Sequence, residues 1–276
     1  MKTRNQLMSE IKNLLKKYNL RAFKSYSQHF MIDPKLIQWQ LEYSNLNKAD
    51  LVVEVGAGLG TLTKELAENA KKVLAVESDP KLVEVLQNEL SIFNNIEIIP
   101  EDILKLDSKI FEGTKIVSNP PYKISSPLTF KILEASYILA LMSYQKEFAV
   151  RMVAESGTKE YGRLSLGVKY YATVDYLKSI PRGFFHPVPK VDSALIRFTP
   201  CIPPFELPNK KDFFEFVRHL FSFRKKTVKH ALNLYLKHRE PRNIDAYDLS
   251  NDSLTYKRVF QLGLEQFYEL YQIFQQ

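Results

Sequence analysis

The sequence predicts an α/β fold in which a mostly parallel central sheet is followed by a small helical domain. From residue 51 onward, short β-branched and apolar runs alternate with segments of helical periodicity. Such alternation is typical of a parallel sheet covered by helices on both faces. A proline-rich break at 200–208 then precedes a stretch with an apolar helical stripe. A chain of 276 residues is long enough for one full core and a smaller second unit.

The strands are expected where apolar runs are short and continuous. The run at 51–55 ends in a series of glycines, which favours a buried parallel strand. The other strands of the parallel sheet are expected at 73–76, 96–99, 115–118 and 138–143. Two further runs, 173–180 and 191–200, are expected to add strands at one edge. The helices between the strands are expected at 60–70, 80–92, 102–111 and 124–136.

The regions outside the sheet read as helical. Apolar residues at helical spacing predict an amphipathic helix at 7–18, and Pro34 is expected to begin another helix at its first turn. We therefore divide the chain into a basic N-terminal helical segment with a loop (1–50), a sheet domain (51–200) and a helical C-terminal domain (209–276).

Composition excludes several classes of protein. The single cysteine, Cys201, cannot form an internal disulfide, and the five histidines lack metal-ligand spacing, so we expect no metal. The longest apolar stretch, around 137–142, is too short to span a bilayer. The N-terminus lacks the apolar core of a signal peptide. These features favour an intracellular, reducing compartment.

The positive charge is concentrated at the N-terminus. The net charge is +8, and residues 1–30 hold seven Lys or Arg residues against one acid, Glu10. Six of the eight net charges thus lie in about a ninth of the chain. A clustered basic segment indicates a polyanionic partner such as nucleic acid. The alternative is a solvated basic helix that has no partner.

A glycine-rich turn follows the first predicted strand. Gly56, Gly58 and Gly60 lie where this strand leads into a helix, and glycine allows a ligand to approach the backbone closely. The pattern indicates a nucleotide-type site at the carboxyl ends of the strands. Glu77 ends the second strand, 17 residues after Gly60, where a carboxylate can accept both hydroxyls of a ribose. The alternative for the three glycines is a tight turn without a ligand, and the alternative for Glu77 is a surface acid at a strand end.

Two further polar groups follow the third and fourth strands. Asp102 can accept a hydrogen bond from an adenine amine, or can simply begin a helix. Residues 118–127 read Ser-Asn-Pro-Pro-Tyr-Lys-Ile-Ser-Ser-Pro. The Asn119 side chain and the Pro120 carbonyl can both accept hydrogens from one amine, and Tyr122 offers a flat face for a base. The alternative is a rigid proline turn before a helix.

With these motifs, the chain resembles the small-subunit ribosomal RNA adenine dimethyltransferase family, whose fold is the Rossmann-like class I methyltransferase fold. The resemblance covers nearly the whole chain. Besides the motifs above, it includes the segments at 24–33, 145–149, 161–165, 185–194 and 223–227.

The resemblance implies a cytoplasmic, S-adenosylmethionine-dependent enzyme that dimethylates two adjacent adenosines in small-subunit ribosomal RNA during ribosome assembly. We expect it to act as a monomer on the RNA or the pre-small-subunit particle. The residues expected to hold the cofactor are His29 and Met31, which close over it, and Gly56, Gly58, Glu77, Asp102 and Asn119.

The resemblance also implies how the target base is held. Asn119 and Tyr122 hold the base, and Phe185 packs on it from the opposite side. Asn119 and Pro120 orient and polarise the amine without abstracting a proton. Phosphate contacts are expected from Arg163, Arg224, Lys225 and Lys226, in addition to the basic N-terminal segment. The alternatives are core packing for Phe185, a structural ion pair for Arg163 and a solvated helix face for the remaining basic residues.

Two positions depart from the family pattern. Ser27 stands where the family usually has Gly, and Pro120 stands where it has Leu or Ile. The Asn-Pro-Pro-Tyr form also occurs in enzymes that transfer one methyl group, which leaves single and double methylation both open. The sequence is also compatible with a large-subunit RNA or DNA adenine methyltransferase and with a non-catalytic assembly factor.

Overall fold

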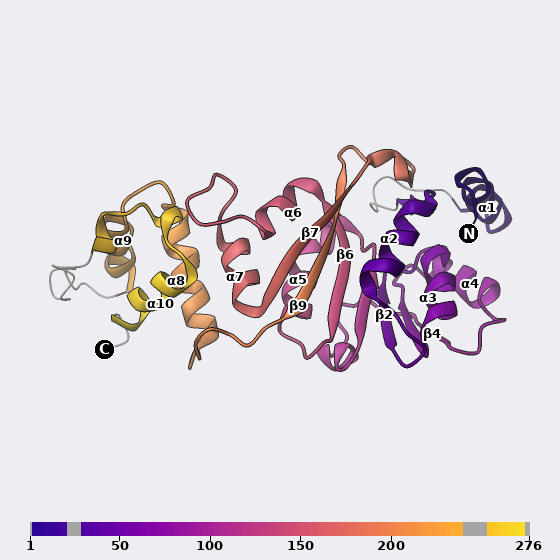
Figure 1. Ribbon diagram of the computed structural model, residues 1–276, viewed down its shortest axis with the longest axis horizontal. Helices are drawn as coiled ribbons and strands as arrows, with labels where there is room; N and C mark the ends of the chain where they lie inside the picture. Colours follow the sequence, from indigo (N-terminus) through magenta and orange to yellow (C-terminus); the bar gives the residue numbers. More distant parts are fainter. Residues whose placement is uncertain (1, 21–28, 240–252, 274–276) are drawn as a thin grey trace. The chain divides into compact units, whose positions relative to one another are not determined.

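The computed structural model describes residues 2–20, 29–239 and 253–273 and divides into two compact units. Unit 1 comprises 1–149 and 174–200, and unit 2 comprises 150–173 and 201–276. Figure 1 labels the helices and strands of both units. The N-terminal 50 residues belong to the same unit as the sheet. The segment 150–173, which we had assigned to the sheet domain, belongs to unit 2 with the C-terminal helices.

A seven-stranded sheet forms the centre of unit 1, in the order β4-β3-β2-β5-β6-β9-β7. The first five of these strands are parallel, and β9 runs antiparallel to β6. This confirms the predicted mostly parallel sheet and its two additional strands at one edge. The strands are β2 (Leu51–Val55), β3 (Lys72–Val76), β4 (Ile96–Ile99), β5 (Lys115–Ser118), β6 (Leu139–Gln145), β7 (Ala172–Ile180) and β9 (Ser193–Pro200).

The order in which strands are added to the sheet changes direction at β2: β3 and β4 lie on one side of it, and β5 and β6 lie on the other. From β2 the chain steps outward through β3 and β4, then returns to the other side of β2 with β5 and β6. In open α/β sheets, ligands bind at the carboxyl ends of the strands beside such a switch point. The order of strands therefore places a candidate site where β2 and β5 end.

Helices alternate with the strands as the sequence predicts, except between β4 and β5. They are α1 (Arg4–Lys17), α2 (Pro34–Ser44), α3 (Thr61–Asn69), α4 (Pro80–Glu89), α5 (Ser125–Leu133) and α6 (Lys146–Met152). Asp33 and Asp79 cap α2 and α4 by accepting backbone N–H bonds, and a proline follows each of them. Leu36 and Ile37 of α2 pack in one core cluster with Val117 of β5.

The predicted helix at 102–111 is wrong. The structure has turns there, followed by a short 3-10 helix, η2 (Ser108–Phe111). Asp102 accepts a hydrogen bond from the Leu104 N–H at 2.9 Å, and Asp107 accepts one from the Lys109 N–H at 2.9 Å. Such local side-chain bonds compete with helical backbone bonding, and two of them interrupt this short segment.

A second, two-stranded sheet joins the N-terminal segment to a distant loop. Strand β1 (Phe30–Met31) pairs antiparallel with β8 (Phe185–His186). The register sets Met31 opposite Phe185, although these residues are separated by most of unit 1 in sequence. The pairing brings two segments of the family resemblance, 24–33 and 185–194, side by side. The part of the first segment at 24–28, including Ser27, lies outside the described residues.

Unit 2 is helical in the part that the structure describes. Its elements are α7 (Arg163–Tyr171), α8 (Lys210–Ser222), α9 (Val228–Arg239), η6 (Ser253–Tyr256), η7 (Val259–Gln261) and α10 (Leu264–Ile273). Its core is aromatic, with Phe213, Phe216 and Phe267 fully buried. No helix among the residues described in either unit is long and apolar enough to cross a membrane.

Candidate active site

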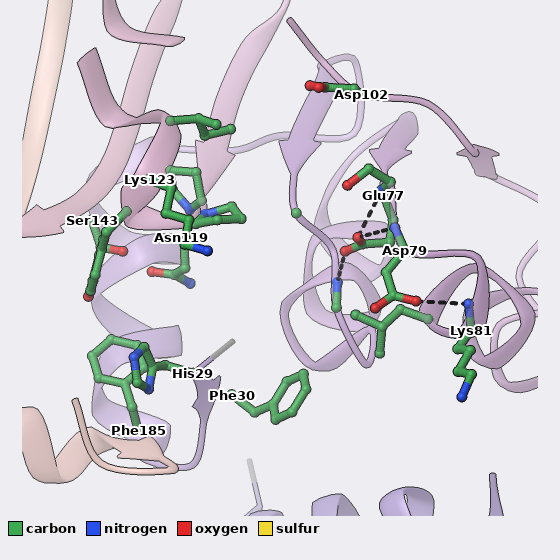
Figure 2. Close-up of a pocket in the computed structure, with 18 of the residues that line it drawn as sticks. His29, Phe30, Glu77, Asp79, Lys81, Asp102, Asn119, Lys123, Ser143 and Phe185 are labelled. Carbon is green, nitrogen blue, oxygen red and sulfur yellow. Dashed lines mark hydrogen bonds between the residues drawn. The ribbon is translucent and has the colours of Figure 1, made fainter. Parts of the chain in front are cut away.

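A cavity of about 690 Å³ lies at the carboxyl ends of the strands, beside the switch point. Figure 2 shows its labelled residues on two sides. Glu77, Asp79 and Asp102 form one side, which we call the acidic wall. His29, Asn119, Ser143 and Phe185 lie on the other side, which we call the amide wall. Gly56, Gly58, Pro120 and Tyr122 also line the cavity.

The glycine turn after β2 lines the cavity through Gly56 and Gly58. Gly56 has φ +73°, and a Cβ atom there would lie 3.0 Å from Cδ of Pro121. Any side chain at position 56 would therefore be strained and would displace the proline turn. Gly58, with φ +60°, presents its N–H to Glu77. These glycines hold an open backbone surface beside the cavity.

Backbone N–H groups fix the Glu77 carboxylate. One oxygen, Oε2, accepts from Gly58 at 3.0 Å, and Oε1 accepts from Ser78 at 2.8 Å and Asp79 at 2.9 Å. Burial raises the pKa of Glu77, and these three hydrogen bonds oppose the shift. Since a carboxylate has about four acceptor positions, roughly one remains for a ligand hydroxyl. The sequence predicts that Glu77 accepts both ribose hydroxyls, whereas the structure leaves an acceptor position for one.

The other two acids hold their positions through their own turns. Asp79 Oδ1 accepts from the Lys81 N–H at 3.0 Å, and Asp102 Oδ1 accepts from the Leu104 N–H at 2.9 Å. Asp102 is half-buried, with its backbone in the turn after β4. It lines the cavity, as predicted, from the turn that follows β4.

A buried serine anchors the start of the amide wall. The Ser118 hydroxyl donates to the Val55 carbonyl at 2.5 Å and accepts from the Val55 N–H at 3.1 Å. These bonds join the ends of β5 and β2, where the backbone ladder between them has stopped. Ser118 therefore ties the Asn-Pro-Pro-Tyr segment to the glycine turn. We did not identify Ser118 from the sequence, because a serine at a strand end is common.

The Asn119 side chain faces a buried glutamine. Asn119 Nδ2 donates to Gln40 Oε1 at 3.1 Å, and Gln40 Nε2 donates to Asn119 Oδ1 at 3.3 Å. Asn119 Nδ2 also lies 3.8 Å from the sulfur of Met31. Met31 is buried and is not among the residues that line the cavity, so it lies behind Asn119. This position differs from the prediction that Met31 closes over a cofactor.

Aromatic side chains complete the amide wall. The Tyr122 hydroxyl is hydrogen-bonded to the Ser193 hydroxyl at 2.5 Å. Burial raises the pKa of Tyr122, so the phenol is neutral at neutral pH. The His29 ring lies 6.3 Å from the Tyr122 ring, and His29 Nδ1 donates to the Pro187 carbonyl at 2.7 Å. Phe185 is buried but reaches the cavity.

Ser143 is a cavity residue that sequence reasoning missed. Ser118 of β5 pairs with Met142 of β6. Ser143, the next residue of β6, therefore lies beside Asn119 at the ends of these two strands (Figure 2). Its hydroxyl is buried and makes no hydrogen bond within the described part of the chain. Nothing in the pattern of 138–143 distinguishes this serine from any other residue of a buried strand.

The four basic residues expected to contact RNA lie in unit 2 and differ in environment. Arg163 is exposed at the start of α7, and Lys225 and Lys226 are exposed after α8. Arg224 is engaged internally. Its Nη2 donates to the carbonyls of Thr158, Lys159 and Tyr161 at 3.3, 2.9 and 3.0 Å. We therefore assign Arg224 to holding the 158–161 loop.

Known proteins resemble this chain over most of its length. The family model "Ribosomal RNA adenine dimethylase" matches residues 19–276. A "probable ribosomal RNA small subunit methyltransferase A" of Methanosarcina mazei is 44% identical over 222 residues, which cover 80% of this chain and 81% of the relative.

Two solved structures share the fold. A dimethyladenosine transferase from Plasmodium falciparum has a TM-score of 0.76 and 27% identity, covering 90% of this chain and 98% of the other. The 23S rRNA methyltransferase ErmE has a TM-score of 0.67 and 30% identity, covering 90% of this chain and all of the other.

Proposed function

This chain belongs to the ribosomal RNA adenine dimethylase family, and on that premise we propose that it dimethylates N6 of two adjacent adenosines in small-subunit ribosomal RNA during ribosome assembly. The methyl donor is S-adenosylmethionine. The observation that carries the proposal is the cavity with its two walls: acids for a cofactor on one side, and an amide with aromatic rings for a base on the other.

The acidic wall and the glycine turn fit S-adenosylmethionine. The cavity volume of about 690 Å³ lies in the range of about 300–1,000 Å³ that is common for cofactor sites. Glu77 would accept a ribose hydroxyl at its remaining acceptor position. Asp102 would accept from the adenine amine through Oδ2, because the turn uses its Oδ1. The carboxylates also suit a cationic ligand.

The amide wall would hold and polarise the target base. When bound, the cofactor supplies an activated methyl group, so no protein nucleophile is required. Asn119 Oδ1 and the Pro120 carbonyl would accept hydrogens from the adenine amine, which favours a tetrahedral nitrogen whose lone pair faces the donor. Tyr122 and Phe185 would enclose the ring, and base stacking on an aromatic ring contributes about 1–3 kcal/mol. Alignment of the two reactants can supply about 7–11 kcal/mol of the barrier.

A second transfer requires space beside the amine. After one methylation only one N–H remains, and the first methyl group must occupy the position of the hydrogen it replaced. Ser143 offers this space, because it is small, lines the cavity and lies beside Asn119. The presence of Pro120 in place of Leu or Ile is therefore compatible with the dimethylation that the family carries out.

RNA would be bound through phosphate contacts from both units. Lys12 and Lys16 of α1 are exposed in unit 1, as are Arg163, Lys225 and Lys226 in unit 2. The target adenosine must leave its stack to enter the cavity, which RNA loops allow at low cost. We place the reaction in the cytoplasm, on the pre-small-subunit particle, with the protein acting as a monomer.

Incubation of under-methylated small ribosomal subunits with isotope-labelled S-adenosylmethionine tests this function. Nucleoside mass spectrometry after digestion should find label in N6,N6-dimethyladenosine, and mapping should place it at two adjacent positions of the small-subunit RNA. Large subunits and duplex DNA serve as parallel substrates. Label in either of these, with none in small subunits, would contradict the proposal.

A further inference from the structure

We propose that Gln40 of α2 is a positioning residue that fixes the plane of the Asn119 amide toward the target amine. The proposal rests on the role proposed above for Asn119 and concerns a residue outside every motif of the family resemblance. It starts from the pair of hydrogen bonds between two side-chain amides at the amide wall.

The two amides form a closed ring of hydrogen bonds. Each one donates an N–H to the oxygen of the other, at 3.1 and 3.3 Å. One hydrogen bond would leave Asn119 free to rotate about its terminal torsion, which is broad for an amide. Two bonds in a ring restrict that torsion, because rotation of either amide breaks both. The pair therefore holds the plane of the Asn119 amide.

The ring alone does not determine which end of Asn119 bears the oxygen. Turning both amides by 180° would form an equivalent ring with the Asn119 nitrogen and oxygen exchanged. The sulfur of Met31 removes this ambiguity, since it lies 3.8 Å from Asn119 Nδ2 and accepts, weakly, only from an N–H. Met31 and Gln40 together thus fix both the plane and the orientation.

This arrangement leaves the acceptor that the reaction needs. An amide oxygen has two lone pairs, and Gln40 uses one of those on Asn119 Oδ1. The other remains for a hydrogen of the target amine. Because methyl transfer requires the nitrogen lone pair in line with the donor, a rotating acceptor would scatter the amine over unproductive orientations.

Burial explains why a glutamine at this position requires a partner. Gln40 has 0% exposure, and its helix neighbours Leu36 and Ile37 belong to the apolar core. A buried amide without hydrogen bonds is costly, and an apolar side chain would suit such a site. The pair with Asn119 offsets this cost. Gln38, on the same helix, is exposed and provides a matched control.

The first test replaces Gln40 by Leu, which suits its apolar surroundings. We expect Gln40→Leu to lower kcat on small subunits by up to about hundredfold, the effect of a misplacement of about 1 Å. The cofactor affinity of Gln40→Leu, measured by calorimetry, and its melting temperature should stay close to wild type. For the control Gln38→Leu, kcat, cofactor affinity and melting temperature should all stay close to wild type. A kcat within about twofold of wild type would overturn the proposal, as would a parallel loss of cofactor affinity.

The second test replaces Gln40 by Glu and compares its kcat with that of wild type at each pH. Among the described residues, the Gln40 side chain hydrogen-bonds to the Asn119 amide, which does not titrate, and the Met31 thioether behind that amide does not titrate either. Burial raises the pKa of a glutamic acid, and only its protonated form can both donate to Oδ1 and accept from Nδ2. The ratio should therefore be highest at the lowest pH and fall as the pH rises. A ratio that does not change with pH overturns the proposal.

Asn119→Ala separates this inference from the proposed function. If Asn119→Ala is as active as wild type, the role of Asn119 fails and the role of Gln40 fails with it. If Asn119→Ala is inactive while Gln40→Leu has wild-type kcat, only the inference about Gln40 is lost.

Discussion

The two walls of the cavity are held in place by different means. On the acidic wall, backbone N–H groups hold Glu77, Asp79 and Asp102, and all of them except that of Gly58 come from one or two residues further along the chain. On the amide wall, side chains from distant elements hold one another. Gln40 hydrogen-bonds to Asn119, and Ser193 hydrogen-bonds to Tyr122. Figure 2 shows the two groups facing each other across the cavity.

This difference suits the ligands proposed for each wall. A cofactor of constant structure can be held by rigid turns, whose geometry follows from glycine and capping residues. A base that arrives on a large RNA needs an acceptor that points at one hydrogen, and side-chain pairs can hold that acceptor in one orientation. The comparison leads us to expect that substitutions on the acidic wall affect cofactor binding and that those on the amide wall affect transfer.

Asn119→Ala is the strongest test of this separation. It removes the acceptor from the amide wall, and we expect transfer to small subunits to fall by at least about hundredfold, as when a polarising group is removed from other active sites. Calorimetric affinity for S-adenosylmethionine should change little. Equal losses of binding and transfer would mean that the two walls are not functionally distinct.

Glu77→Ala should produce the converse result. Loss of a hydrogen bond to a charged group costs about 1.5–3 kcal/mol, which weakens the calorimetric Kd for S-adenosylmethionine about tenfold to hundredfold. At saturating cofactor, kcat should recover substantially. Glu101→Ala, at an exposed acid near the same wall, is the control. Unchanged affinity in Glu77→Ala would count against a ribose contact.

Tyr122→Phe should have a smaller effect on transfer than Asn119→Ala. It keeps the ring but removes the hydrogen bond to Ser193, a net contribution of about 0.5–1.5 kcal/mol. We expect kcat to fall about two- to tenfold with cofactor affinity unchanged. Tyr176→Phe removes a similar bond, which is exposed and joins a half-buried tyrosine to Ser179, and should have no effect. An identical response in both variants would mean that the tether at Tyr122 has no special role.

At Glu54 on β2 we expect an effect on stability. Burial raises the pKa of Glu54 to about 8, with a smaller contribution from the charge of Glu77. Because the native pKa lies above the ordinary value of 4.5, the stabilisation is complete below about pH 4.5 and is lost as the pH rises through about 8.

Melting temperatures between pH 5 and about pH 9 test this assignment. Glu54→Gln cannot ionise, so its melting temperature should rise relative to wild type as the pH increases and should level off above about pH 8. Glu101→Gln, at an exposed site, should follow the wild-type curve. Parallel curves for wild type and Glu54→Gln would indicate that Glu54 is already ionised in the native state.

The same contrast explains what the sequence could predict. The strands and most helices were predictable because burial and capping leave local patterns, such as Asp33-Pro34 and Asp79-Pro80. Glu77 and Asp102 were identifiable because each follows a strand that ends at the same edge. The exception at 102–111 arose because an apolar helical pattern did not reveal that its two aspartates form turns.

The amide wall was predictable only in part. Asn119, Pro120 and Tyr122 belong to a recognisable segment, but their partners do not. Gln40 and Ser193 reach them from 79 and 71 residues away, respectively, and no local pattern records such a contact. Arg224 shows the same limitation, because a basic run predicts exposure and the carbonyls that hold its guanidinium lie more than 60 residues away.

The pairing of β1 with β8 determines when the cavity can become complete during synthesis. Phe30 and Met31 meet His186 and Phe185 only after about two thirds of the chain has been translated. A nascent chain that has reached residue 105 already contains every carboxylate of the acidic wall. Phe185 arrives much later, and it is placed by closing a loop of about 150 residues. A chain that stops before this point contains the acidic wall but lacks Phe185, so the amide wall is complete only after residue 186 has been synthesised.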